Sequence, residues 1–303
     1  MRAGRRAFLR ALAAAALTRN AFEATSKPSV TLVVGDRCRA GRLHAPPGFA
    51  VFTRAYTVCP EPERCLQSIL TGRYPHSRTD EQTPTVRTIL DNAGIRCEVI
   101  DLSGQQTYSG SVAALESEAE RVASRSDPNT ILVITATRGA MLGAHDSDTD
   151  DTWFEEAARV PLLVRWPSRV RAGDLDLLCT SVDILPTILG LCGVGRPDDL
   201  QGHDLSPFLV GGSGNRPEYV YGEGGFGTEW EWRMLVRGLD KAVFDANGEL
   251  EHLYNLGEDP AEDHDLAGNP DQERRRDELT ALAADVRRRL GDHMDPSGLR
   301  RRR

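Results

Sequence analysis

The sequence of 303 residues has little lysine, few aromatic residues and no long apolar run. Lysine occurs only at positions 27 and 241, so arginine carries nearly all of the positive charge, and the net charge is -8. This acidic balance argues against non-specific binding to nucleic acid. A helix that spans a bilayer needs roughly 20 apolar residues, so the sequence predicts no transmembrane segment.

Six cysteines are present without a CxxC pair or the spacing of metal ligands, at positions 38, 59, 65, 97, 179 and 192. This scatter is typical of thiols in an ordinary core. An even number would permit disulfides in an oxidising compartment, but their connectivity does not follow from the spacing.

The N-terminus carries paired arginines and a short apolar segment at residues 4–17, GRRAFLRALAAAAL. This pattern resembles a twin-arginine export signal. The apolar run stops at Arg19, however, and no clean small-x-small cleavage site follows it. Export and a cytoplasmic location with a disordered N-terminus both remain open.

Apolar, β-rich runs alternate with segments of helical periodicity along the first two thirds of the chain. Residues 30–35 (VTLVVG) and 131–136 (ILVITA) are typical of buried parallel strands. Alternation of strands and helices predicts an α/β fold, a mostly parallel sheet between helices. Further strands are predicted at 97–102 and 160–167, and helices at 65–70, 85–93, 112–123 and 181–193.

The loop GGSGNRP at 211–217 is the best candidate domain boundary. Beyond it, YVYGEG, RMLVRG and KAVFD predict short strands, and residues 272–290 a final helix, together a small C-terminal α+β subdomain. The predicted division is an N-terminal signal or disordered segment (1–27), an α/β domain (28–213), the subdomain (214–292) and a disordered basic tail (293–303).

Six segments in this order resemble the sulfatase family of the alkaline phosphatase superfamily, from about Pro28 to the final helix. They are PSVTLVVGD; FTRAY with ILTGRYPH; TVRTILDNAGIRCEVID; ITATRG with LGAHD; FEEAARVPLLVRWP with VDILPTILGLCGV; and LYNLGEDPAEDHDLA. The resemblance implies the α/β fold of that family and hydrolysis of sulfuric esters as its chemistry. It also implies a divalent cation held by carboxylates, and a Cys or Ser oxidised to formylglycine.

The family's nucleophile belongs to a C/S-x-P-x-R pattern, nine residues before the Thr of Thr-Gly. Counting back from Thr71 places Pro62 at that position, and the Pro and Arg of the pattern fall on Arg64 and Leu66. Cys59 fits only if the register is shifted, and a slip of one residue turns a helical side chain by about 100°. The resemblance therefore implies that the nucleophile is lost.

The family's cation positions are also changed. The first strand ends in Asp36-Arg37, and the family's T-S-D-H-G appears with Thr137 and Arg138 at the ligand positions. Calcium takes six to eight oxygens with anionic ligands among them, so Asp36 is a residual ligand and no bound metal is expected, with calcium only if the family site survives. We predict instead an Asp36–Arg138 ion pair, with Arg37 facing the old pocket or solvent; the alternative is that both arginines point outward.

Of the family's remaining site residues, only Asp36 and His145 keep their type. The family's Lys-Trp-His segment aligns with Leu102-Ser103-Gly104, and its later Lys with Asp150. Because open α/β sheets build their sites beyond the carboxyl ends of the strands, five positions should converge there. They are Asp36, Pro62, Thr137, Arg138 and His145.

Two acidic residues, Glu61 and Glu63, stand where the resemblance places the start of a helix that faces an anion. Their carboxylates would compete for the free N–H groups and repel a sulfate. The alternative is that both simply face solvent.

These features lead to two hypotheses from different classes. The first is a catalytically impaired sulfatase-family protein that binds a sulfated or anionic ligand or a protein partner. The second is an active sulfatase or phosphoesterase with altered chemistry, using His145 with Cys59 or Cys65, whose pKa nearby arginines would lower. A decaying reading frame with a poorly folded product is a third, smaller possibility.

Overall fold

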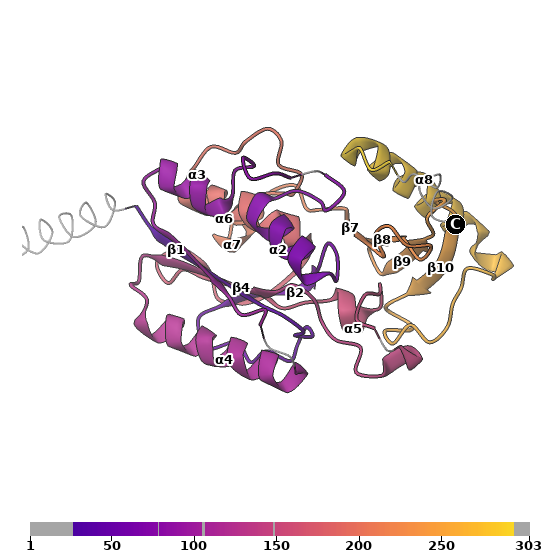
Figure 1. Ribbon diagram of the computed structural model, residues 1–303, viewed down its shortest axis with the longest axis horizontal. Helices are drawn as coiled ribbons and strands as arrows, with labels where there is room; N and C mark the ends of the chain where they lie inside the picture. Colours follow the sequence, from indigo (N-terminus) through magenta and orange to yellow (C-terminus); the bar gives the residue numbers. More distant parts are fainter. Residues whose placement is uncertain (1–26, 78, 105–106, 148, 294–303) are drawn as a thin grey trace, which may run out of the picture.

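The computed structural model describes residues 27–293 apart from positions 78, 105–106 and 148. The predicted export signal and basic tail lie outside the described residues, except for their inner ends. Figure 1 shows a larger part built on one sheet and a smaller part built on a second sheet, which ends in a long helix. Within the described residues, no helix is both long and apolar enough to cross a membrane.

The larger sheet has six strands in the order β3-β1-β4-β5-β2-β6. All neighbours are parallel except β5, which runs antiparallel to both β4 and β2. The short helix α5 (Glu155–Ala158) explains this, because the loop after β4 bonds to it: the N–H of Gly139 donates to the Ala157 carbonyl at 2.8 Å. The chain therefore starts β5 beside the carboxyl end of β4 and runs back in the opposite direction. The mostly parallel α/β sheet is confirmed. The strands are β1 (Ser29–Gly35), β2 (Ala50–Tyr56), β3 (Cys97–Asp101), β4 (Thr130–Ala136), β5 (Leu162–Arg165) and β6 (Gly173–Thr180).

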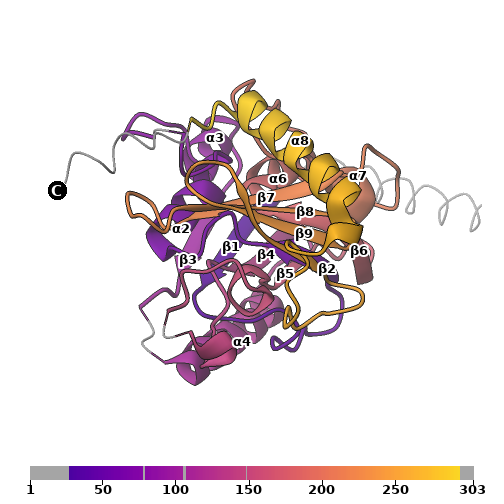
Figure 2. The same ribbon diagram turned by 90° about the vertical axis from the view of Figure 1, so that its right-hand side faces the viewer.

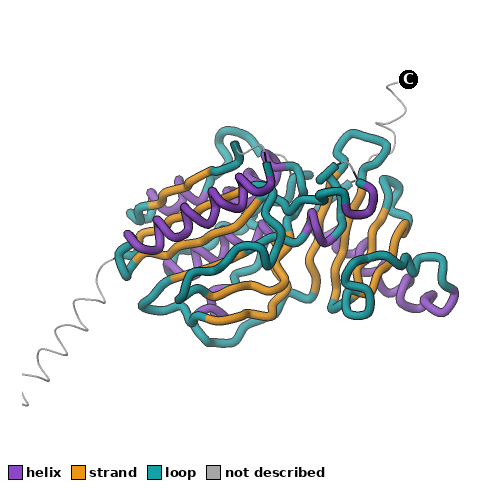
Figure 3. Tube along the Cα trace, turned by 90° about the horizontal axis from the view of Figure 1, so that it is seen from below, coloured by secondary structure: helices purple, strands orange, loops and turns teal. Residues whose placement is uncertain are grey.

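Helices cover both faces of this sheet (Figures 1 and 3). Alternate side chains of β1 point to opposite faces, as a strand requires. Leu32 and Val34 therefore join the core under α2, α3 and α6, whereas Val33 packs in the core that contains Leu115 of α4. The helices are α2 (Pro62–Thr71), α3 (Val86–Asn92), α4 (Tyr108–Arg125) and α6 (Ile184–Cys192).

The helix boundaries refine the predictions from the sequence. Helix α2 begins at Pro62, three residues before the predicted start, because proline fits the first turn, where no helical N–H bond is lost. The sequence allows the helix predicted at 181–193 either to be interrupted at Pro186 or to start there, and the structure is close to the second alternative: a 3₁₀ turn, Ser181–Asp183, precedes α6 and places Pro186 in the first turn of the helix. Shorter pieces are α7 (Ser206–Leu209) and the 3₁₀ turns Ala144–Asp146 and Pro270–Gln272.

The smaller sheet is antiparallel, in the order β10-β9-β8-β7. Helix α8 (Glu273–Leu290) lies across it, as Figure 2 shows, and buries Leu279, Ala283 and Val286 against it. This is the predicted α+β subdomain, although the exact boundary at residue 213 stays a prediction. Its strands are β7 (Tyr219–Gly224), β8 (Trp232–Arg237), β9 (Asp240–Phe244) and β10 (Leu250–Asn255).

Candidate functional site

The carboxyl ends of the neighbouring strands β1 and β4 bring Asp36, Thr137 and Arg138 together. The two strands run in register up to Gly35 and Ala136, and the N–H of Thr137 donates to the Gly35 carbonyl at 2.9 Å. The next side chain on each strand therefore projects from the same end of the sheet. This is the place where open α/β sheets carry their sites.

Asp36 and Arg138 form the predicted ion pair. Nε of Arg138 donates to Oδ1 of Asp36 at 3.0 Å and Nη2 to Oδ2 at 3.3 Å, so the guanidinium covers both carboxylate oxygens. The hydroxyl of Thr137 donates to Oδ1 at 2.8 Å. Asp36 is 4% exposed, and its charge needs such partners, since an unpaired buried carboxylate costs several kcal/mol. The alternative, with both arginines outward, is wrong.

Arg37 is also paired, which corrects the expectation that it faces the pocket or solvent freely. Its Nη2 lies 3.1 Å from Oδ2 of Asp150. The same carboxylate accepts the N–H of Met141 at 2.7 Å, so it is held in place by the loop after β4. Arg37 has a left-handed backbone, with φ of 50°, at the turn out of β1. Both arginines, at positions where the resemblance implies cation ligands, are thus paired with aspartates of this chain.

Helix α2 starts beside this pair. Nη1 of Arg138 lies 3.5 Å from the Pro60 carbonyl, two residues before Pro62 begins the helix. Glu61 is the N-cap but makes no side-chain cap bond; its carboxylate accepts from Nε of Arg64 at 2.8 Å, and Glu63 is exposed. The expected competition for the helix N–H groups is therefore wrong, because Glu61 has a nearer cation.

The elbow, residues 57–62 between the end of β2 and the start of α2, has two buried, hydrogen-bonded thiols in or near it. Cys59 and Cys65 are both 0% exposed. The sulfur of Cys65 lies 3.1 Å from the hydroxyl of Thr57 and 3.4 Å from that of Ser181. Burial raises the pKa of both thiols, so the expectation that nearby arginines lower it is wrong. Neither side chain is an activated nucleophile in this conformation.

His145 lies in the loop after β4, against α5. Its Nε2 is 3.5 Å from Oε2 of Glu156, and its ring stacks on Phe154 with the centroids 3.7 Å apart. The Glu156 carbonyl accepts the N–H of Ala140, which ties this group to the strand end that carries Arg138. Of the five expected positions, Asp36, Thr137 and Arg138 contact one another. Pro62 follows two residues after Pro60, whose carbonyl Arg138 approaches, whereas the contacts of His145 are with Phe154 and Glu156.

Asp151 is a neighbour that the sequence reasoning missed. Its Oδ1 is buried without a hydrogen-bond partner among the described residues. Burial raises its pKa, while the N–H of Gly225 and the charges of Arg138 and Arg64 oppose that shift. Two guanidiniums and one carboxylate with an unpaired oxygen therefore lie close together beside the Asp36–Arg138 pair, a group that we call the mouth of the site. The only available signal was the acidic run at 146–151, which is also typical of a solvated loop.

The donor set at Asp36 does not fit a calcium ion. Both carboxylate oxygens accept from Arg138, one of them also from Thr137, and a guanidinium occupies the side where a cation would bind. At the place of the family's Lys-Trp-His, Ser103 offers only a backbone N–H to Asp101 at 2.9 Å. These residues supply too few oxygens and too little negative charge for Ca²⁺.

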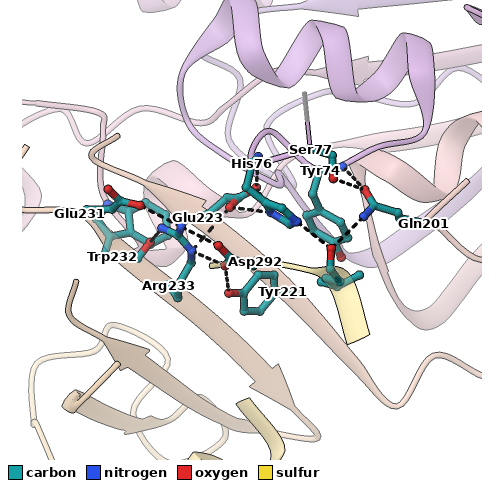
Figure 4. Close-up of polar contacts among 11 residues, drawn as sticks. Tyr74, His76, Ser77, Gln201, Tyr221, Glu223, Glu231, Trp232, Arg233 and Asp292 are labelled. Atoms are coloured by element: carbon teal, nitrogen blue, oxygen red, sulfur yellow. Dashed lines mark hydrogen bonds and ion pairs between the residues drawn. The ribbon is translucent and has the colours of Figure 1, made fainter. Parts of the chain in front are cut away.

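Among the described residues, one other group has potential ligand atoms close together. His76, Glu223 and Asp292 place one such atom each within 4.8 Å of one another (Figure 4). Arg233, however, lies between the carboxylates, with its Nε 2.6 Å from Asp292 and 3.5 Å from Glu223. Its guanidinium provides the positive charge that a metal would bring, so this group forms a salt-bridge network.

Comparison with known proteins finds sequence similarity to sulfatases. A family model described as N-sulphoglucosamine sulphohydrolase, C-terminal, matches residues 148–289. The chain is 28% identical over 178 residues to an N-acetylglucosamine-6-O-sulfatase of Bacteroides thetaiotaomicron, covering 55% of this chain and 32% of the relative. It is 28% identical over 158 residues to an arylsulfatase of Clostridium perfringens, covering 51% and 33%. The matched segments thus span about a third of these curated relatives.

Solved structures share the fold. A 2-O GAG sulfatase aligns with a TM-score of 0.77 at 17% identity, covering 90% of this chain and 96% of the other. A phosphonate monoester hydrolase of Agrobacterium radiobacter aligns with a TM-score of 0.76 at 13% identity, covering 87% and 96%. These alignments cover nearly the whole chain, so the chain shares the overall fold of these proteins. The chain therefore belongs to the sulfatase family, within the alkaline phosphatase superfamily.

Proposed function

We propose that this chain is a sulfatase-family protein that does not hydrolyse sulfate esters by the family's formylglycine chemistry and that binds an anionic, sulfated ligand instead. The observation that carries the proposal is the two-point bond between Arg138 and Asp36. It fills the position where the family resemblance implies a cation. Pro62, at the implied position of the nucleophile, has no group that could attack sulfur.

A ligand-binding role is supported by the charges at the mouth of the site. Arg64 is 47% exposed in its side chain and Arg138 20%, and both lie close enough to Asp151 to affect its pKa. Arginine recognises planar and tetrahedral oxyanions through paired N–H groups. One structural neighbour, with a TM-score of 0.76, was solved in complex with D-glucosamine-2-N,6-O-disulfate. A sulfated sugar is therefore the first ligand to test.

The alternative is an active sulfatase or phosphoesterase that uses Cys59 with His145. A phosphonate monoester hydrolase is among the structures with this fold, so the scaffold is compatible with such chemistry. The local geometry favours the first proposal, because Cys59 is fully buried with a raised pKa and His145 pairs with Glu156.

The test measures turnover and metal content on the same preparation. The purified full chain is incubated with 4-nitrophenyl sulfate and 4-nitrophenyl phosphate, with and without added calcium, beside an active arylsulfatase as positive control. We expect no turnover above background and no stoichiometric divalent ion. Turnover that is lost in Cys59→Ala would establish the alternative, and a stoichiometric ion that is lost in Asp36→Asn would overturn the proposal.

Binding is tested by calorimetric titration with D-glucosamine-2-N,6-O-disulfate. Arg64→Ala should weaken binding at least about tenfold, since a charge-assisted contact is lost. Arg274→Ala is the matched control, because this arginine is 92% exposed on α8 and pairs only with Glu278. If the wild type and Arg64→Ala bound the ligand with equal affinity, the ligand would not bind beside Arg64.

A further inference from the structure

A buried polar cluster joins the two parts of the molecule at His76. This residue follows α2 in the larger part, whereas Glu223 lies in β7 and Arg233 in β8 (Figure 4). Leu290 ends α8. His76 is separated by 147 residues from Glu223 and by 214 from Leu290. One imidazole thus bridges the α/β part, the second sheet and the end of the last helix.

The hydrogen bonds of His76 require a charged ring. Its Nδ1 lies 3.0 Å from each carboxylate oxygen of Glu223, and its Nε2 lies 3.1 Å from the Leu290 carbonyl. Both partners only accept hydrogen bonds. A neutral imidazole has a single N–H and satisfies one of them, whereas the imidazolium satisfies both.

The charges around His76 lead to the same conclusion. The side chains of Glu223 and Asp292 are 0% and 1% exposed, and between them lies one guanidinium, that of Arg233, 2% exposed. It donates to both oxygens of Asp292, at 2.6 and 3.0 Å. Two buried carboxylates and one buried cation leave a net negative charge, which is costly away from water. A proton on His76, whose side chain is 10% exposed, completes the balance.

The other groups that face the cluster do not supply a second positive charge. Tyr221 donates its hydroxyl to Asp292 at 2.6 Å, and the ring of Tyr74 stacks on His76 at 5.8 Å. Burial, together with the nearby carboxylates, raises the pKa of both tyrosines, so they stay neutral. Glu231 accepts from Arg233 at 2.8 Å and adds negative charge from the rim.

The cluster also sets the pH range in which His76 is charged. Burial disfavours the charged ring, but the hydrogen bond and charge of Glu223, the charge of Asp292 and the Leu290 carbonyl outweigh burial. Together they raise the pKa of His76 above its ordinary 6.5.

We infer that His76 is a proton-dependent latch, which holds β7 and the end of α8 against the α/β part while its ring is charged. When the ring loses its proton, either Glu223 or the Leu290 carbonyl loses the hydrogen bond from the imidazole, although the backbone N–H of His76 and the amide of Gln201 still donate to them. The buried cluster also becomes net negative. A raised folded-state pKa means that the stabilisation is complete below the unfolded value near 6.5. It is lost as the pH rises through the higher folded value.

The test is hydrogen exchange of the full chain between pH 6 and 9, followed at β7 (residues 219–224) and at the end of α8 (287–292). After correction for intrinsic rates, wild-type opening should increase with pH, by at most about tenfold per pH unit for one proton. In His76→Gln, which keeps one donor but no charge, this dependence should disappear. An unchanged dependence in His76→Gln would overturn the latch.

His203→Gln is the matched control. His203 also has a raised pKa, because it hydrogen-bonds to Asp183, but its side chain is 47% exposed and it bonds elsewhere in the larger part. Hydrogen exchange at β7 and α8 should keep its pH dependence in His203→Gln. If the dependence were lost in this variant, His203 and not His76 would be the group that senses pH.

A second variant keeps the inference testable if His76→Gln does not fold. Glu223→Gln keeps an acceptor for Nδ1 but removes one negative charge, so Arg233 alone balances Asp292. The cluster then no longer needs a charged His76 ring, and the pH dependence of hydrogen exchange should vanish. In the wild type, the NMR titration of the His76 ring should have its midpoint above 6.5. A midpoint below 6.5, or a stoichiometric divalent ion lost in His76→Gln, would refute the inference.

Discussion

The end of β1 and β4 and the junction between the two sheets both hold buried ion pairs, but they are built differently. At the strand ends, single arginines pair with single aspartates, and Arg138 remains 20% exposed. At the junction the clusters are closed: the side chains of Lys241 and Glu262 are both 0% exposed. In the first region, a partly exposed arginine can still contact a ligand. In the second, the charged side chains of Lys241 and Glu262 are buried and contact only protein groups.

The two regions nevertheless share a backbone connection. The N–H of Glu223 donates at 2.8 Å to the carbonyl of Val58, in the elbow that leads to Pro62. This hydrogen bond joins β7 of the second sheet to the segment that precedes α2. The difference teaches that this chain has the framework of the sulfatase fold, whereas a simple pair of opposite charges occupies the strand ends where the family resemblance implies a cation.

The largest effect is expected at the junction, from Lys241→Met. Nζ of Lys241 lies 2.8 Å from Glu262 and 3.1 Å from Glu155, so the variant leaves two carboxylates without their buried cation. We expect a loss of about 3–5 kcal/mol in the free energy of unfolding, measured by chemical denaturation. Arg274→Ala is the control and should change it by less than about 1 kcal/mol, because its ion pair is exposed. Similar losses in both variants would contradict the comparison.

A smaller loss is expected at the strand ends, from Arg138→Ala. Asp36 would keep the Thr137 hydroxyl, so we expect about 2–3 kcal/mol in the free energy of unfolding. The double variant with Asp36→Asn should cost clearly less than the sum of the single variants, since the two groups bond directly. Strict additivity in this cycle would show that the pair has no energetic role.

Restoring a hydroxyl at the implied nucleophile position should change little. Proline at the first position of α2 is well tolerated but not required, so Pro62→Ser should alter stability by about 1 kcal/mol or less. Turnover of 4-nitrophenyl sulfate should stay at background, because Arg138 still covers Asp36. Activity gained in this variant alone would show that the site needs only a nucleophile.

The smallest effect is expected for thiol reactivity. Cys59 and Cys65 should resist iodoacetamide at pH 8 in the folded protein and react after denaturation, because burial raises the pKa of both. Peptide mass spectrometry of labelled samples reads out each position. Rapid labelling of Cys59 in the native protein would revive the hydrolase hypothesis.

Much of the fold follows from local pattern. The fully apolar runs of β1 and β4 predict buried strands, and their order with the helices predicts the mostly parallel sheet. By contrast, β2 and β6 carry polar residues such as Arg54 and Asp174 and lack that signal, so they were not predicted. The direction of β5 was also missed, because it depends on where the loop through α5 returns to the sheet.

The candidate site was partly predictable for a similar reason. Asp36 and Arg138 follow two recognisable strands, so their meeting at one end of the sheet could be derived from the sequence. His76 and Glu223 could not be paired in this way, since each is ordinary in its own segment and only the docking of the second sheet brings them together. Asp150 and Asp151 have the sequence pattern of an ordinary acidic loop, because the arginines near them come from distant parts of the chain.

The interleaved strand order has a consequence for how the chain folds. Ser29 at the start of β1 bonds to Thr130 at the start of β4, 101 residues away, and β2 is completed only by β6. Pairings this distant in sequence close large loops before they gain stability, which slows folding and favours intermediates in chains of this size. His76 meets Leu290 across 214 residues, so the bond between the two parts forms only when the last helix has been made. During synthesis, the contacts between the two sheets would therefore form last, and the apolar surface that α8 buries would stay exposed to aggregation until this helix docks.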